Sequence, residues 1–290
     1  MKAALATLLL LLPIWVIPSQ EIIAVEVYGS PVLVTSSGSE PLLEGTSLPA
    51  SGRLSLGAES EVTLRSGSRE ISLFRRGVYE VGELFTFRPL GRIAFEDLFA
   101  QRIREVIDAS RRGEQTSPEA LLAALIREEA SRAPTELRRA VQALVGGSYE
   151  AAWSALDRYL ENEQIPERDL SDLIRVLAAQ SAYFLDRNLE AFRLLEAATA
   201  EPDHPHYPLY TLLRSQLLIE SHAFADALET LSEFLQTPRG GHPELQTARL
   251  QTGVAYEGLG NLPVARTYYR RATSPDPTSP VARAARQLLQ

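Results

Sequence analysis

Two glycines near the C-terminus, Gly258 and Gly260, have the spacing with which a phosphate-binding loop begins. A dinucleotide-binding loop also needs a third glycine three residues further on, a strand before it and an acidic residue after it. Pro263 occupies the position of the third glycine, and the other two features are not evident. We therefore predict that these glycines form a turn between two helices and bind no nucleotide.

Histidine is the other residue type that could support chemistry, because imidazole binds zinc and transfers protons. His204, His206 and His242 are expected to lie in connections between helices, on one edge of the molecule. The third is far from the first two along the chain, and no carboxylate pattern accompanies them. The sequence also lacks the motifs of zinc proteases, serine hydrolases and P-loop proteins. We predict no metal, no cofactor and no catalysis; an enzyme whose site the sequence does not reveal is one alternative.

The composition of the 290-residue chain narrows the choice further. The formal net charge is −8, whereas a nucleic-acid-binding protein normally presents a basic face. The absence of cysteine excludes thiol nucleophiles, iron–sulfur clusters and disulfides. The length and the ordinary share of hydrophobic residues, 45%, predict a folded protein of roughly two domains.

The N-terminus is typical of a secretory signal peptide. Lys2 supplies a positive charge, and residues 3–17 are almost wholly apolar but fewer than the ~20 that span a bilayer. A helix break and Ser19 follow, so we expect cleavage after Ser19. Ile17 stands where a small residue is preferred, which leaves an uncleaved membrane anchor as the alternative. We predict that residues 1–19 are a signal peptide and that the mature protein is exported, to the bacterial periplasm.

Residues 22–92 have a pattern typical of β-structure. Apolar and polar residues alternate in short runs, and clusters of glycine, serine and proline separate the runs. The predicted strands are residues 24–28, 31–35, 53–56, 61–65 and 70–74. This pattern indicates a small all-β domain, either a sandwich or a barrel.

Part of this segment, LLEGTSLPASGRLSLGAESEVTLRSGSREISLFRRGVYEV at residues 42–81, resembles the FecR-type β domain of bacterial periplasmic proteins. In both, a turn anchored by glycine, here between Gly45 and Gly52, precedes strands with a Val-x-Leu pattern. The segment is shorter than is usual for that family. The resemblance implies a role in envelope sensing or in binding envelope partners, without catalysis.

From Ala94 onward the apolar period changes to 3.6 residues, which is typical of helices. A first helix carries an apolar stripe that includes Phe95. A second is expected to begin at Ser117, where serine and the following proline offer an N-cap and a first helical position. We predict a linking helical hairpin over residues 94–132 and a domain boundary near residues 88–94.

A five-part pattern then recurs four times. Its alanines, Ala152, Ala191, Ala227 and Ala265, are spaced by 39, 36 and 38 residues. The other parts are a small residue (Ala140, Ala179, Ser215, Gly253), a turn residue (Gly147, Asp186, His222, Gly260), a large apolar residue (Leu156, Leu195, Leu231, Tyr269) and a proline (Pro166, Pro202, Pro238, Pro277). Because small side chains let two helices approach closely, each repeat is predicted to be a helical hairpin.

The pattern resembles the tetratricopeptide (TPR) repeat, whose period is ~34 residues. The resemblance covers residues 133–277 and implies an all-α solenoid, closed by a capping helix over residues 278–290. The repeats are longer than usual for that family. The predicted fold class is therefore α+β and multidomain, with a small all-β sandwich or barrel followed by a TPR-like solenoid.

In TPR proteins the first helix of each hairpin lines a groove that binds an extended segment or a helix of a protein partner. The matching positions are Val176, Gln180, Tyr183, Leu212, Gln216, Ile219, Leu250 and Val254. Several of these could instead pack against the next repeat. An amide is costly to bury unpaired, so Gln180 and Gln216 are expected to pair with a partner's backbone, with Tyr183 as an aromatic anchor beside them.

Together these features predict an exported envelope scaffold or adaptor that binds a protein partner through the TPR groove, without catalysis. The alternative from a different class is an envelope sensing protein whose β domain binds a glycan or a peptide. Nucleic acid is not an expected partner. The membrane is an expected partner only if the N-terminal segment is uncleaved.

Overall fold

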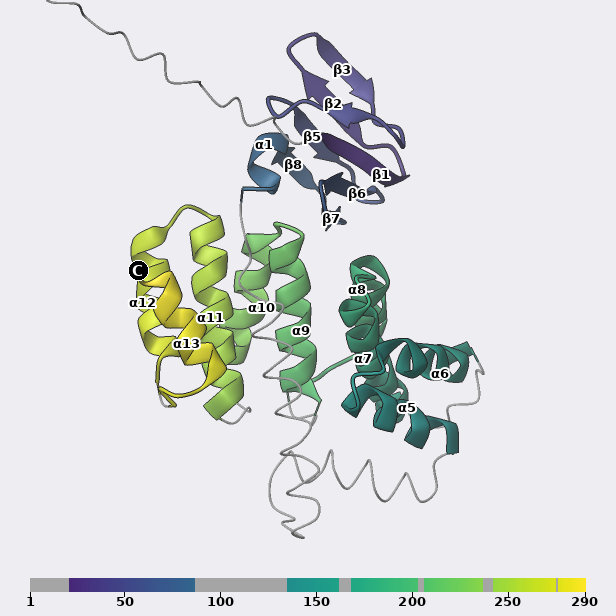
Figure 1. Ribbon diagram of the computed structural model, residues 1–290, viewed down its shortest axis with the longest axis vertical. Helices are drawn as coiled ribbons and strands as arrows, with labels where there is room; N and C mark the ends of the chain where they lie inside the picture. Colours follow the sequence, from purple (N-terminus) through teal and green to yellow (C-terminus); the bar gives the residue numbers. More distant parts are fainter. Residues whose placement is uncertain (1–20, 87–134, 162–167, 203–205, 237–241, 275) are drawn as a thin grey trace, which may run out of the picture.

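The computed structural model describes residues 21–86, 135–161, 168–202, 206–236, 242–274 and 276–290 (Figure 1). The predicted signal peptide, the predicted domain boundary and the predicted linking hairpin lie outside these residues. In the described chain, a β region of two antiparallel sheets is followed by a helical region (Figure 1).

The β region consists of short strands and one short helix. They are β1 (Ile22–Tyr28), β2 (Val32–Thr35), β3 (Gly38–Pro41), β4 (Ser47–Leu48), β5 (Arg53–Leu56), β6 (Glu61–Ser66), β7 (Arg69–Leu73), β8 (Gly77–Glu80) and α1 (Val81–Leu84). One sheet has the strand order β4-β1-β6-β7, and the other has the order β3-β2-β5-β8. The neighbouring strands in both sheets pair in antiparallel fashion.

Both sheets turn apolar side chains toward one shared core, so the β region is a sandwich. The core residues are Ile22, Ala24, Leu33, Leu42, Leu48, Leu54, Leu56, Val62, Leu64, Ile71, Leu73, Val81 and Leu84. Strand β5 illustrates how the sequence produces this core: its two leucines are buried, whereas Arg53 is exposed. Alternation of this kind buries one face of a strand and solvates the other.

All five strands predicted from the sequence are present. The structure adds β3, β4 and β8. Strand β3 has no buried residue, and β4 is only two residues long. Neither could produce a pattern of alternating apolar residues, which explains why the sequence did not reveal them.

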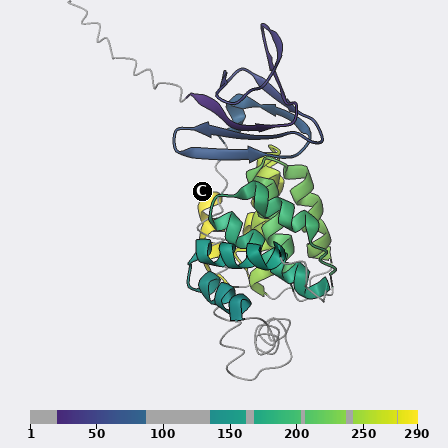
Figure 2. The same ribbon diagram turned by 90° about the vertical axis from the view of Figure 1, so that its right-hand side faces the viewer.

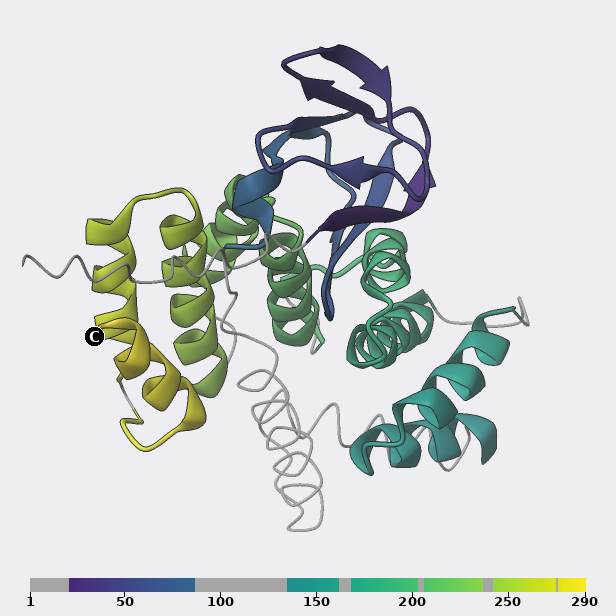
Figure 3. The same ribbon diagram turned by 45° about the horizontal axis from the view of Figure 1, so that its top comes forward.

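The helical region consists of consecutive helices joined by short connections. They are α5 (Thr135–Val145), α6 (Tyr149–Glu161), α7 (Arg168–Phe184), α8 (Asn188–Ala197), α9 (Tyr207–Glu220), α10 (Phe224–Gln236), α11 (His242–Gly258), α12 (Leu262–Ala272) and α13 (Pro280–Leu288). Figures 1 and 3 show these helices following one another in space in chain order, with α5 near one end and α13 near the other. None of the helices in the described ranges combines the length and the apolar character needed to cross a membrane.

Four hairpins, α5–α6, α7–α8, α9–α10 and α11–α12, share one turn geometry. The turn residues Gly147, Asp186, His222 and Gly260 all have a left-handed backbone, with φ of 74°, 63°, 59° and 76°. The next residue in each turn donates its N–H to the carbonyl five residues earlier, at 2.8 to 2.9 Å. This arrangement ends a helix by satisfying its last carbonyls. The four turn residues predicted from the sequence are therefore confirmed.

Close packing inside each hairpin depends on the small residues predicted for it. Ala152, Ala191, Ala227 and Ala265 are fully buried. Gly253 is the extreme case, because a Cβ atom added there would lie 2.4 Å from Cε1 of Tyr269. The ring of Tyr269 therefore occupies the space that any side chain at position 253 would need.

The last helix, α13, packs against α12 and α11. The Ser279 side chain accepts a hydrogen bond from the Ala282 N–H at 3.1 Å, and Pro280 stands in the first turn. These are favourable residues for a helix start. Helix α13 buries Val281 and three alanines, and its arginines face solvent.

The β region lies across one end of the helical region. Figure 2 shows its strands running crosswise over the ends of the helices. The parts closest to it are α8, α9 and α10, which lie beneath β7, β8 and α1 in Figure 1. The two regions therefore meet along a surface that both contribute to.

The Gly253 position gives a direct test of the helical packing. We expect Gly253→Ala to lower the free energy of unfolding by about 1–3 kcal/mol, because the new methyl group overlaps the Tyr269 ring. An alanine in an open helix would instead stabilise it by up to ~1 kcal/mol. Gly57→Ala is the control, since its Cβ would meet nothing closer than 3.4 Å. Equal denaturation midpoints for both variants would show that the hairpin is looser than described.

Candidate functional site

An aromatic contact joins the β region to the helical region. Phe74, directly after β7, packs against Phe192 of α8 with ring centroids 4.3 Å apart. The guanidinium of Arg214 on α9 lies 5.7 Å from the centre of the Phe192 ring. Aromatic pairs of this kind contribute ~0.5–1.5 kcal/mol beyond the area they bury. Phe74 thus attaches the end of one sheet to the core of the helices.

Two arginines add ion pairs around this contact. Arg75 lies 2.6 Å from Asp226 in the first turn of α10 and 3.6 Å from Glu196 of α8. Arg193 of α8 lies 2.5 Å from Glu61 of β6. These side chains are partly exposed, so each pair is worth about 1 kcal/mol or less. They are further contacts between the β region and the helices.

A second contact forms at the α9–α10 turn. His222 hydrogen-bonds to the backbone of Leu84, at the end of the β region. Burial lowers the pKa of His222 to about 4, and the nearby positive charge of Arg69 acts in the same direction. The ring is therefore neutral at neutral pH. Arg69 in turn donates to the Phe85 carbonyl at 2.6 Å, which holds the end of α1 in place.

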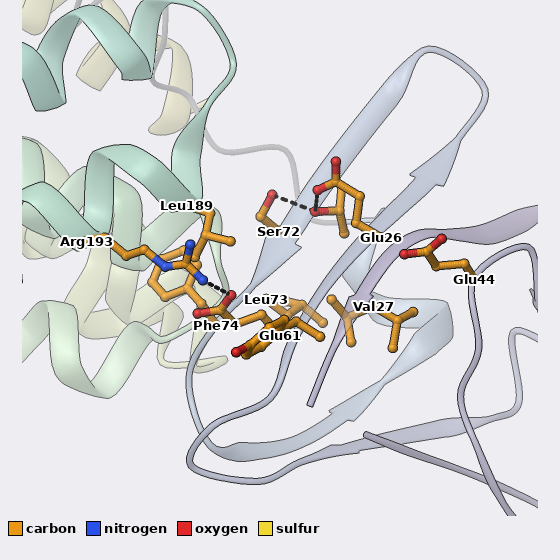
Figure 4. A pocket seen from close by; sticks show the side chains of 12 residues that line it. Glu26, Val27, Glu44, Glu61, Ser72, Leu73, Phe74, Leu189 and Arg193 are labelled. Atoms are coloured by element: carbon orange, nitrogen blue, oxygen red, sulfur yellow. Dashed lines mark hydrogen bonds and ion pairs between the residues drawn. The ribbon is translucent and has the colours of Figure 1, made fainter. Parts of the chain in front are cut away.

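Between the Phe74 contact and strand β1 lies a crevice of about 350 Å³ (Figure 4). Its floor is the outer face of β1, β6 and β7, and Leu189 and Arg193 of α8 form one wall. Glu44, from the loop before β4, lines the opposite side. The lining residues are Glu26, Val27, Tyr28, Glu44, Glu61, Val62, Thr63, Ser72, Leu73, Phe74, Leu189 and Arg193. Both regions therefore build this crevice, and neither forms it alone.

A row of polar side chains crosses the crevice floor. Glu26, Thr63 and Ser72 are directly opposite one another in the strand register. The Thr63 hydroxyl lies 3.3 Å from a Glu26 carboxylate oxygen and 3.3 Å from the Ser72 hydroxyl (Figure 4). The floor thus presents a line of carboxylate and hydroxyl oxygens that a bound ligand could contact.

A bulge in β1 places Glu26 in the crevice. The register between β1 and β6 shifts between Ala24 and Glu26. Without the extra residue, strict alternation would put Glu26 on the same face as the buried Ala24. The bulge reverses that alternation, so that Glu26 and Tyr28 are exposed on the outer face.

The eight groove residues predicted from the sequence lie elsewhere and are buried. Their exposed fractions run from 0% to 4% in Val176, Gln180, Tyr183, Leu212, Gln216, Ile219, Leu250 and Val254. The expectation that they form an open surface is therefore wrong. Tyr183, expected as an exposed anchor, is fully buried and donates its hydroxyl to Glu220 at 2.6 Å. Partner binding by these residues stays a prediction, and it would require their exposure.

The amides expected to bind a backbone behave differently from each other. Gln216 donates to Glu220 at 2.7 Å and accepts from Gln251 at 3.1 Å. Gln180, one repeat earlier, is fully buried, and neither its amide nitrogen nor its oxygen forms a hydrogen bond with the described part of the chain. Buried polar groups are nearly always paired, so an unpaired amide carries a cost.

The two histidines whose side chains the structure describes lie apart, at opposite ends of α9. His206 is buried at the start of α9, and His222 lies at the junction with the β region. His204 and the side chain of His242 lie outside the described part of the chain. Within the described residues, no group of three histidine, aspartate or glutamate side chains could hold a metal ion.

The crevice was not predicted from the sequence. Its floor corresponds to the polar residues Glu61, Thr63 and Ser72 of the alternating strands, and such a pattern does not distinguish a binding surface from an ordinary solvated sheet face. Glu26 could not be assigned to this face from the sequence, because the bulge shifts the alternation of β1. Arg193 belongs to a helix 132 residues away from Glu61, and no local pattern links them.

Comparison of the chain with models of protein families, with curated proteins and with solved structures gives no match. The function must therefore be argued from the geometry of the chain itself.

The two glutamines give a paired prediction. Gln180→Leu is expected to raise the free energy of unfolding by about 1 kcal/mol, because it removes a buried amide that makes no hydrogen bond to any residue that the structure describes. Gln216→Leu is expected to lower it by about 1–3 kcal/mol, because Glu220 and Gln251 each lose a partner. Chemical denaturation of both variants measures the difference. Destabilisation by both changes to the same extent would mean that Gln180 is paired in solution.

Proposed function

We propose that this protein is a non-catalytic adaptor of the bacterial envelope that binds a protein partner. The observation that carries this proposal is the crevice, whose floor comes from the β region and whose wall comes from α8. A surface built by two regions suits a protein that joins partners. The crevice replaces the groove predicted from the sequence as the binding surface, because the groove residues are buried.

Membership of the TPR class is part of the proposal. It is supported by four hairpins that each have a residue of left-handed backbone at the same place in the turn and a buried alanine at the same place in the second helix. Kinship of the β region with the FecR-type domain is also proposed, on the sequence resemblance in residues 42–81. Export to the periplasm is proposed on the apolar N-terminal segment alone.

A second candidate is a sensing protein whose β region binds a glycan or a peptide. The polar row on the crevice floor supports it, because Glu26, Thr63 and Ser72 present carboxylate and hydroxyl oxygens that could bond to sugar hydroxyls. The two candidates differ in the ligand that occupies the crevice. A cross-linking experiment at its edge separates them.

Tyr28 is suited to that experiment, because it lines the crevice and is 65% exposed. We expect a photo-reactive phenylalanine analogue at this position to cross-link one discrete protein in cells that make the full chain. Val78 on β8 is the control, since it is 64% exposed and belongs to the other sheet. The same analogue at Val78 should give no such product.

Mass spectrometry of the adduct then decides between the candidates. A polypeptide joined through Tyr28 supports the adaptor, whereas a saccharide adduct supports the sensing protein. Equal protein adducts from Tyr28 and Val78 would contradict the crevice as the binding surface.

A further inference from the structure

We infer that the crevice binds an extended segment of the partner that carries lysine or arginine side chains. This inference rests on the proposed adaptor function and names the chemistry of what the adaptor binds. Its basis is the combination of an open sheet face, an edge of β1 along which the described chain places no strand, and an excess of carboxylates over cations in the lining. No one of these features would suffice alone.

The strand edge favours an extended ligand. Strand β4 pairs only with Ile22 and Ile23 of β1. Ala24 exchanges backbone hydrogen bonds with the loop at Gly45 and Thr46, at 2.8 and 3.0 Å. Beyond Ala24, no strand of the described chain lies along this side of β1. An extended peptide can use such an edge through main-chain hydrogen bonds, with side-chain pockets adding specificity.

The size of the crevice agrees with a short segment. Its volume of about 350 Å³ falls at the lower end of the range for ligand pockets, roughly 300–1,000 Å³. It extends from Glu44, past the β1 edge, over the sheet face to α8 (Figure 4). A strand paired along the β1 edge would lie in the plane of this sheet and turn every second side chain to its outer face, beside Glu26 and Glu44, at a spacing of roughly 7 Å.

The charge of the walls selects a cationic ligand. Three carboxylates, from Glu26, Glu44 and Glu61, line the crevice against the single guanidinium of Arg193. The chain as a whole carries a net charge of −8. Complementary charge steers association and rejects wrong partners, so an acidic segment would be excluded.

Two of the carboxylates are already placed to receive a cation. Glu61 holds the Arg193 guanidinium at 2.5 Å, which shows that a guanidinium fits at this position. The Arg193 side chain is 54% exposed, so it can move aside when a second cation arrives. Glu26 is oriented over the floor by the Thr63 hydroxyl. Glu44 is exposed at the far wall and makes no hydrogen bond or ion pair with the described residues.

The test uses a defined probe with the full chain. The probe is a fluorescent, amidated octapeptide that alternates lysine with threonine, and its binding is followed by fluorescence anisotropy at low salt. We expect saturable binding that weakens as salt is added, because partly exposed charges are screened. The matched octapeptide of glutamate and threonine should not bind.

Paired variants locate the site. Glu44→Gln should weaken binding by about threefold or more, as expected for the loss of one exposed ion pair. Glu40→Gln is the control, because Glu40 is also exposed but lies on β3 in the other sheet. Its affinity should equal that of the unchanged protein. Equal effects of the two changes would overturn the assignment to the crevice.

Free spermine tests whether the ligand must be extended. It carries positive charge but has no peptide backbone, so it should compete poorly with the octapeptide. Competition at equal concentration would show that charge alone determines binding, and would overturn the inference of a strand-like ligand. Failure of the lysine octapeptide to bind at all would overturn the inference entirely. The adaptor function would then still be decided by the cross-link at Tyr28.

Discussion

The position of Phe74 is the constraint on which the arrangement of this protein depends. Its ring reaches from the end of β7 into the helical region and packs on Phe192. The ion pairs of Arg75 and Arg193 add further contacts between the same two regions. Because the crevice lies between the sheet and α8, it exists only while this contact holds. The chemistry of the floor belongs to the β region, but its shape is set by the junction.

Local features of the sequence predicted the helical region well. A left-handed turn needs a residue that tolerates positive φ, and Gly147 and Gly260 meet this need without cost. His222 and Asp186 are less usual choices, and their place in the repeat was the signal that identified them. Buried alanines between helices followed from the same repeat. Such patterns are readable because every residue involved lies within one hairpin.

The binding surface could not be predicted in the same way, because it depends on contacts between distant parts of the chain. Arg75 and Asp226 are separated by 151 residues, and no repeat or spacing relates them. The bulge that exposes Glu26 breaks the two-residue alternation of buried and exposed side chains on which a strand prediction depends. For Tyr183 and Gln180, the repeat pattern predicted an exposed position that the fold does not give them. Their places matched a groove, but both are buried, and the amide of Gln180 finds no hydrogen-bond partner among the described residues.

The central claim is that Phe74 holds the two regions in one fixed arrangement. The chain contains no cysteine, so cysteines introduced at Glu40 and Arg266 can carry two spin labels without competing sites. The distance distribution between them, measured by pulsed electron paramagnetic resonance, should be narrow and single in the otherwise unchanged protein. Phe74→Ala should broaden it, while Tyr28→Ala, an exposed aromatic outside the contact, should not. A distribution that is already broad before Phe74 is changed would contradict the account.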